Sequence, residues 1–325
     1  MLPKIRALTF KRNISRSFAL PVNQTLEILR ATNANFEGLF SHKALSQLWF
    51  KQGESIVLNL NQHLSQTSSS LTQDKDYTLQ ELVSVTINKP DLYNIHKNAA
   101  KLYNLTTFFE NLRPLQIGPV ELDRPGPEAM LQTPTNSFLN VPTDEGFVDW
   151  LEDSFGSITE FRNLLINTAK AIKGDGTVWL VAESTLSDNY LQKNISLYNS
   201  APAFSNLSIV ATYNGGVVND SERSGQIKRM KSMFEKEEED MEPTRSSDAD
   251  NDDLQLGTTE QAEYETAYLN KKLVPVLAID ASPRNYLVDY GVYGKQKYLE
   301  NCWECIDWDV VLRRLPERSK QAITM

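Results

Sequence analysis

The sequence is poor in long apolar runs and in cysteine. No apolar run approaches the ~20 residues that a membrane-spanning helix needs, which argues against a membrane-spanning role. Only two cysteines occur, Cys302 and Cys305, spaced as C-x-x-C. A metal or redox site of this type requires a second pair or a strand-to-helix turn, and neither is visible in the sequence. We therefore expect a reduced pair, buried or half-exposed, within a helical segment.

The chain also lacks an excess of positive charge. Its 325 residues carry a formal net charge of −9 with a pI near 5.1, which argues against a protein that wraps a nucleic-acid backbone by itself. Residues 217–265 hold 15 acidic and 6 basic residues and so account for all of this net charge. The rest of the chain is balanced, which leaves RNA contact to local patches.

Acidic residues are missing from the start of the chain. The first is Glu27, whereas residues 1–19 contain five basic residues among scattered apolar ones. An amphipathic, basic, acid-free leader without a continuous apolar stretch is typical of a mitochondrial transit peptide rather than a secretory signal. The alternative is a disordered basic tail of a cytosolic protein. We assign residues 1–19 to a transit peptide.

Helical patterns dominate the first half of the remaining sequence. Apolar residues at helical spacing predict helices over residues 23–64, where Gly53 is expected to mark a bend, and over residues 90–112. Residues 65–75 form a polar connection. These stretches predict an N-terminal helical hairpin domain over residues 23–113. A proline-rich segment, residues 114–142, is expected to link it to a second lobe.

The second lobe, residues 143–316, mixes helices with short strands. A helical region is expected at residues 147–173, followed by strands at residues 177–182, 207–213 and 273–279 and by closing helices through Trp303 and Trp308 to Leu315. This order predicts an α+β fold with a three-stranded antiparallel sheet rather than repeated βαβ units. Residues 217–265 have too few bulky apolar residues to offset chain entropy, so we expect an acidic disordered insertion.

Six local motifs resemble iron/manganese superoxide dismutases in their order along the chain. They are I-V-L-N-L-N at 56–61, N-A-A-K-L-Y-N at 98–104, F-G-S at 155–157, G-D-G-T-V-W-L-V at 174–181, L-A-I-D at 277–280 and the closing segment 301–315. The resemblance covers residues 26–315 apart from the linker and the insertion. It implies the fold of that family, an N-terminal helical hairpin followed by an α+β lobe.

The same resemblance implies that the family's metal site is dismantled. Three histidines and one aspartate hold the metal in that family, and here their positions fall at Leu48, Leu105, Asp280 and Arg284. Only the aspartate remains, and a guanidinium cannot deprotonate to become a ligand. We expect Asp280 and Arg284 to form an ion pair in the vacated cavity, with Leu48 and Leu105 filling it.

Positions around the ligands differ as well. The gateway tyrosine of the family becomes Ile56, its neighbouring histidine becomes Gln52, and the glutamate that bridges two sites across the dimer becomes Pro283. The chain's three histidines, at positions 42, 63 and 96, fall away from every ligand position and are interpreted as ordinary helix or loop residues. The prediction is therefore no catalytic residue, no metal and no cofactor.

The combination of a mitochondrial leader and a superoxide dismutase-like fold without metal ligands resembles one group of this superfamily. This group is the non-catalytic fungal mitochondrial small-subunit ribosomal proteins. The long insertion resembles the larger of two paralogues that pair there. The resemblance implies a structural component of the mitochondrial ribosomal small subunit in the matrix, paired with a paralogous superoxide dismutase-like subunit and with peripheral rRNA contact. Two alternatives are a free mitochondrial scaffold dimer and a metalloenzyme of altered chemistry that uses Asp280.

Overall fold

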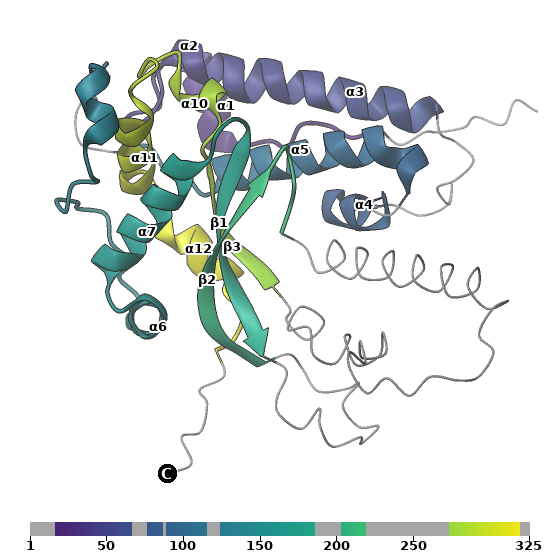
Figure 1. The fold of residues 1–325 in the computed structure, drawn as a ribbon. Helices are drawn as coiled ribbons and strands as arrows, with labels where there is room; N and C mark the ends of the chain where they lie inside the picture. Colours follow the sequence, from purple (N-terminus) through teal and green to yellow (C-terminus); the bar gives the residue numbers. More distant parts are fainter. Residues whose placement is uncertain are drawn as a thin grey trace, which may run out of the picture.

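The computed structural model describes residues 17–66, 77–86, 89–115, 124–185, 203–218 and 273–318. Helices lie around a small twisted sheet (Figure 1). The fold is α+β, with N-terminal helices followed by a region that holds a three-stranded antiparallel sheet, as predicted. Most of the leader and nearly all of the acidic insertion lie outside the described residues. Within the described part of the chain, no helix is both long and apolar enough to cross a membrane.

Four helical segments make up the first part of the N-terminal region. They are α1 (Gln24–Thr32), α2 (His42–Leu45), the π-helical stretch η1 (Ser46–Lys51) and α3 (Gln52–Gln66). The prediction of helix throughout residues 23–64 is wrong between α1 and α2. Asn33 ends α1 in the left-handed conformation, with φ of 50°, and the buried Phe36 and Phe40 then pair across a tight turn. The helix is not interrupted at Gly53, which is buried near the start of α3, directly after the π-helical stretch, and the expected bend there remains a prediction.

A second helical layer packs against α3. It consists of α4 (Leu79–Thr86), the 3₁₀ turn η2 (Pro90–Leu92) and the long helix α5 (Tyr93–Glu110). The expected helix over residues 90–112 is confirmed, whereas α4 was not predicted. α3 and α5 lie side by side (Figure 1). One face of α5 is buried against α3 and another against β3, so this helix joins the N-terminal layer to the sheet.

The proline-rich segment from residue 124 onward runs along the second lobe and contains the 3₁₀ turn η3 (Pro127–Leu131). Glu304 accepts hydrogen bonds from the amides of Leu139 and Asn140, and the buried Arg162 donates to the carbonyl of Thr135 at 2.6 Å. The segment is thus fastened to the helices of the second lobe.

The helical region that follows is divided in two, α6 (Glu145–Phe155) and α7 (Ile158–Ala171). Gly156 ends α6 with φ of 89°, a conformation that favours glycine, and Ser157 caps α7 by accepting a hydrogen bond from the amide of Glu160. Both helices contact the sheet.

Three strands form the sheet, β1 (Gly176–Thr185), β2 (Ala203–Tyr213) and β3 (Leu273–Asp280). The strand order is β2-β1-β3 and both pairings are antiparallel, with Thr177 opposite Thr212 on one side and Asp280 on the other. All three strands were predicted, although each is longer than expected. Both faces of β1 are buried, since Val178 and Leu180 join the main core while Trp179 packs with Tyr103 on the opposite face.

The chain closes with α10 (Pro283–Tyr286), α11 (Lys295–Glu304) and α12 (Trp308–Arg314). Trp303 on α11 and Trp308 on α12 contact each other edge to face, with ring centroids 5.2 Å apart. The predicted closing helices are confirmed. α12 contacts β3, and the Tyr298 hydroxyl of α11 donates to the Asp280 carbonyl, so the end of β3 lies inside the molecule.

Candidate metal site at the end of strand β3

Asp280 is the last residue of β3, and only 1% of its surface is exposed. Its Oδ1 accepts two hydrogen bonds from Ser282, one from the backbone amide at 3.0 Å and one from the hydroxyl at 2.5 Å. Its Oδ2 accepts a hydrogen bond from Nη2 of Arg284 at 2.7 Å. Both carboxylate oxygens therefore have partners supplied by neighbouring residues of the same turn.

Arg284 bridges two carboxylates. Besides Asp280, its Nη1 lies 3.3 Å from Oδ1 of Asp175, and its side chain is 34% exposed. Burial opposes the guanidinium charge, but the carboxylates, Asp280 above all, more than offset this effect and raise the pKa of Arg284. A permanent cation thus occupies the position that the resemblance aligns with a neutral ligand.

The backbone of Asp280 is held as firmly as its side chain. Its carbonyl accepts a hydrogen bond from the Tyr298 hydroxyl at 2.7 Å and another from Nδ2 of Asn285 at 3.1 Å. Burial raises the pKa of Tyr298 well above its usual value, so this phenol remains a protonated donor. The backbone at the end of β3 is therefore anchored to α10 and α11 beside the Asp280–Arg284 pair.

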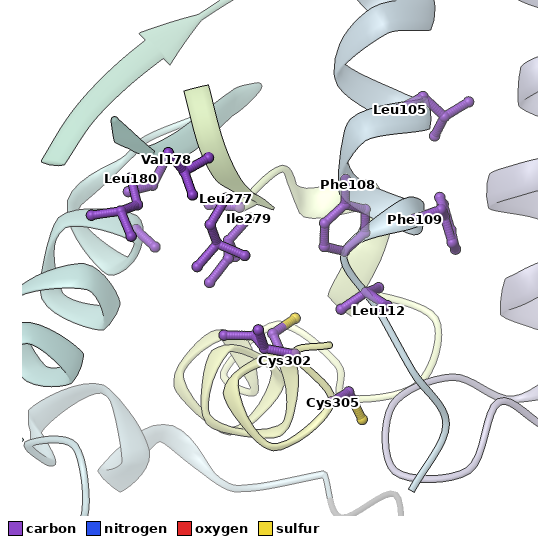
Figure 2. Packing of buried hydrophobic residues seen from close by; sticks show 14 of the residues in the cluster. Leu105, Phe108, Phe109, Leu112, Val178, Leu180, Leu277, Ile279, Cys302 and Cys305 are labelled. Atoms are coloured by element: carbon purple, nitrogen blue, oxygen red, sulfur yellow. The ribbon is translucent and has the colours of Figure 1, made fainter. Parts of the chain in front are cut away.

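The resemblance places the two other ligand positions at Leu48 and Leu105, and both leucines are buried. Leu48 lies in η1 and Leu105 on α5, each is 3% exposed, and both belong to the main hydrophobic core. Leu105 extends from the side of α5 that faces away from the strand residues Val178 and Leu277 (Figure 2). Its Cδ2 lies 3.5 Å from the place that a Cβ on Gly53 would take, so Leu105 packs against the beginning of α3.

The structure confirms the predicted ion pair between Asp280 and Arg284 and the burial of both leucines. That the leucines fill a cavity vacated by the metal remains a prediction. Leucine has no atom that can donate an electron pair to a metal ion, and the guanidinium repels a cation. The residues at the four family positions therefore do not fit the family's metal.

The positions around this site are apolar or uncharged. Ile56 is buried in α3, Gln52 is half-buried at the start of that helix, and Pro283 is the first residue of α10. Across the described ranges, no group of three or more histidine, cysteine, aspartate or glutamate residues is arranged to hold a metal ion.

The three histidines lie on different helices, α2, α3 and α5. His96 is half-buried on α5, where Nδ1 lies 3.2 Å from the carbonyl oxygen of Val83. Burial lowers the pKa of His96, although this hydrogen bond partly offsets the effect. His96 therefore links α5 to the end of α4.

The C-x-x-C pair is reduced and buried, as predicted. Cys302 lies within α11 and Cys305 ends that helix, with 0% and 1% of their surfaces exposed (Figure 2). Burial raises the pKa of Cys305 to about 12 and that of Cys302 well above its usual value. Both thiols are thus protonated and shielded from reagents, which is the behaviour of core residues.

Four residues that position this site were not identified from the sequence, namely Asp175, Ser282, Asn285 and Tyr298. Ser282 could have been found, because a serine directly before a proline is a common helix start, and here it is the N-cap of α10. Asp175 and Tyr298 carry no comparable signal, since tertiary packing alone brings them to Arg284 and to the Asp280 carbonyl.

Comparison with known proteins agrees with this fold. Residues 225–314 match the C-terminal domain of iron/manganese superoxide dismutases. The chain is 29% identical to "Superoxide dismutase [Fe] 3, chloroplastic" of Arabidopsis thaliana and 28% identical to "Superoxide dismutase [Fe] 2, chloroplastic" of Oryza sativa subsp. japonica, each over 145 residues. These alignments cover 45% of this chain and less than half of each enzyme, 45% and 46% respectively.

A third relative aligns over more of the chain. It is "Small ribosomal subunit protein mS42" of Schizosaccharomyces pombe, which is 22% identical over 234 residues, or 72% of each chain. The sequence is thus similar over shorter segments to iron superoxide dismutases and over a longer span to a ribosomal protein. The predicted resemblance both to superoxide dismutases and to a small-subunit ribosomal protein is confirmed.

Proposed function

We propose that this chain, with its iron/manganese superoxide dismutase fold, is a structural protein of the mitochondrial small ribosomal subunit and has no enzymatic activity. The observation that carries the proposal is the Asp280–Arg284 ion pair. The one remaining family ligand is neutralised by an internal cation, and two further ligand positions hold buried leucines. Such a site lacks the donors that redox cycling of a bound metal requires.

Two further observations support the ribosomal role. The alignment with the Schizosaccharomyces pombe small-subunit protein extends over 72% of both chains, beyond the segments shared with the plant enzymes. The basic, acid-free residues 1–19 favour import into mitochondria. The balanced charge of the remaining chain fits a peripheral subunit held mainly by neighbouring proteins, with limited rRNA contact.

We also propose a heterodimer with a paralogous superoxide dismutase-like subunit. Exposed apolar side chains follow α10, where Leu287, Val292 and Tyr293 are 44%, 72% and 40% exposed. Pro283 begins α10 at the position where the family has its dimer-bridging glutamate. Exposed apolar residues beside a former dimer contact are suited to burial by a related chain.

Sedimentation of mitochondrial lysates tests the ribosomal role. On a density gradient, the tagged protein is expected to co-migrate with the rRNA of the small subunit, and to remain with it when low magnesium separates the two subunits. A soluble matrix enzyme serves as the control that stays at the top of the gradient. Protein found only at the top would contradict ribosomal membership and would favour the free scaffold dimer.

Substitution on the exposed surface tests the partner. Leu287→Asp combined with Val292→Asp is expected to release the paralogous subunit in native mass spectrometry of the purified complex. Leu164→Asp is the matched control, because Leu164 is 49% exposed and lies on another helix, α7. Retention of the paralogue by the double variant, or a complex of identical chains, would contradict the heterodimer.

A further inference from the structure

The segment before α1 is held against α3 by a two-sided contact. The amide of Phe18 donates to Oδ1 of Asn61, and Nδ2 of Asn61 donates to the carbonyl of Phe18, both at 2.8 Å. The side-chain amide of Asn61 thus pairs with both backbone polar groups of one residue, as a neighbouring strand would. This contact joins positions 43 residues apart and fixes the register of the segment on the helix.

The segment also has an inner and an outer side. Phe18 and Leu20 are partly buried and pack against the main core, whereas Ser17 and Ala19 between them are exposed. This alternation is that of an extended chain with one face against the protein.

Gly53 provides the space in which Leu20 packs. A Cβ at position 53 would lie 2.6 Å from Cδ1 of Leu20, closer than nonbonded atoms approach. Glycine inside a helix is destabilising relative to alanine, so the presence of Gly53 in the middle of the N-terminal helices requires an explanation. The close approach of Leu20 supplies that reason. It also brings Leu20 near Leu105, the core residue at one of the family's ligand positions.

The charge pattern changes where this contact begins. All five basic residues of the leader precede Ser17, and none follows before Arg30. The part of the chain with the character of a targeting signal therefore ends just before the part that packs on α3.

We infer that residues 18–22 are the first structural segment of the mature protein and that the leader is removed on the N-terminal side of Phe18. The processing part rests on the proposed mitochondrial function. The step is hydrolysis of one peptide bond by a matrix peptidase. One water molecule is consumed, the released leader gains a carboxylate, and the mature chain gains an α-amine. The leader is accordingly shorter than the expected residues 1–19, because Phe18 belongs to the fold.

The N-terminus of the protein recovered from mitochondria tests the processing site. Mass spectrometry is expected to find a mature chain that begins at or before Phe18 and lacks residue 1. A chain that begins at Ala19 or later, or one that retains Met1, would overturn the inference while leaving the mitochondrial location intact. Failure to find the protein in mitochondria would instead refute the proposed function.

Limited proteolysis tests the structural segment independently of import. In the purified full chain, subtilisin is expected to cut before Phe18 and to leave residues 18–22 intact. Asn61→Ala should raise the cleavage rate within residues 18–22 about tenfold through loss of the paired hydrogen bonds. Asn59→Ala is the matched control, since Asn59 is exposed on the same helix. Rapid cutting within residues 18–22 of the unmodified protein would overturn the inference.

A double substitution tests the space above Gly53. Gly53→Ala is expected to lower Tm in the full chain, because the new methyl group displaces Leu20. In a Leu20→Ala background the same substitution should have no destabilising effect or should raise Tm, as alanine does in helix interiors. An equal fall in Tm in both backgrounds would show that Leu20 does not occupy this space.

Discussion

Arg284 donates from Nη2 to Oδ2 of Asp280 at 2.7 Å, four residues after the end of β3. This contact satisfies the carboxylate that would otherwise remain charged and unpaired in the core. The Ser282 hydroxyl and amide complete the set of partners. The aspartate that the resemblance aligns with a metal ligand is thus part of an internal ion pair that closes the turn into α10.

Removal of the cation should destabilise the protein. Arg284→Ala leaves Asp280 buried without its counter-charge, and we expect the free energy of unfolding to fall by about 2–3 kcal/mol, less than for a fully buried pair because Arg284 is partly exposed. Denaturant unfolding measures this. Glu54→Gln is the control, since Glu54 pairs with Arg30 at 3.9 Å on the surface and should change stability by less than ~0.5 kcal/mol. Equal effects of the two substitutions would contradict a structural role for the pair.

The leucine at the first ligand position should contribute to the core. Leu48→Ala is expected to lower the free energy of unfolding by about 2–4 kcal/mol, through lost burial and the cavity left behind. Leu58→Ala on the adjoining helix α3 is the matched control, because Leu58 is 69% exposed and should cost less than ~0.5 kcal/mol. A Leu48→Ala variant as stable as the unmodified protein would mean that this side chain does not fill the core.

His96 should make stability depend on pH. Because burial lowers its pKa in the folded protein, the unfolded chain binds more protons as the pH falls below about 6.5, and this contribution to stability is lost progressively on acidification. His96→Gln is expected to flatten the dependence of the unfolding free energy on pH between about pH 5 and 7. If the slopes of the variant and the unmodified protein coincide, His96 is not the group responsible.

The cysteine pair should react only on unfolding. We expect an aromatic disulfide reagent at neutral pH to label fewer than about 0.1 thiol equivalents per native chain and about two in denaturant, because both thiols are buried and protonated. Absorbance of the released thiolate gives the count. Rapid labelling of the native protein would show that α11 opens and would favour a reactive pair.

Local patterns in the sequence predicted most of the fold. The three strands and α5 were found because their apolar residues have clear periods, and the closing motif placed α11 and α12. The turn after Asn33 was missed, since its cause is a left-handed asparagine followed by two buried phenylalanines whose spacing also suits a helix. The packing of Leu20 above Gly53 was not predicted, because only the three-dimensional structure shows it.

The candidate site was predicted from the charges of the residues at the aligned positions more than from apolar periodicity. Asp280 and Arg284 were expected to pair because opposite charges stood at two of the family's ligand positions, and they do. The additional contact of Arg284 with Asp175 and the bond from Tyr298 depend on tertiary packing, which no local sequence signal encodes. The predicted domain boundaries and the disordered insertion at residues 217–265 remain predictions.

The metal content of the purified full-length protein tests the central claim most directly. Leu48, Leu105 and Arg284 cannot supply ligands, so elemental analysis after expression with added iron or manganese should find less than about 0.1 equivalent of either metal per chain, together with no superoxide dismutation above the buffer rate. Close to one equivalent of iron or manganese per chain, with dismutase activity that chelation abolishes, would contradict the account.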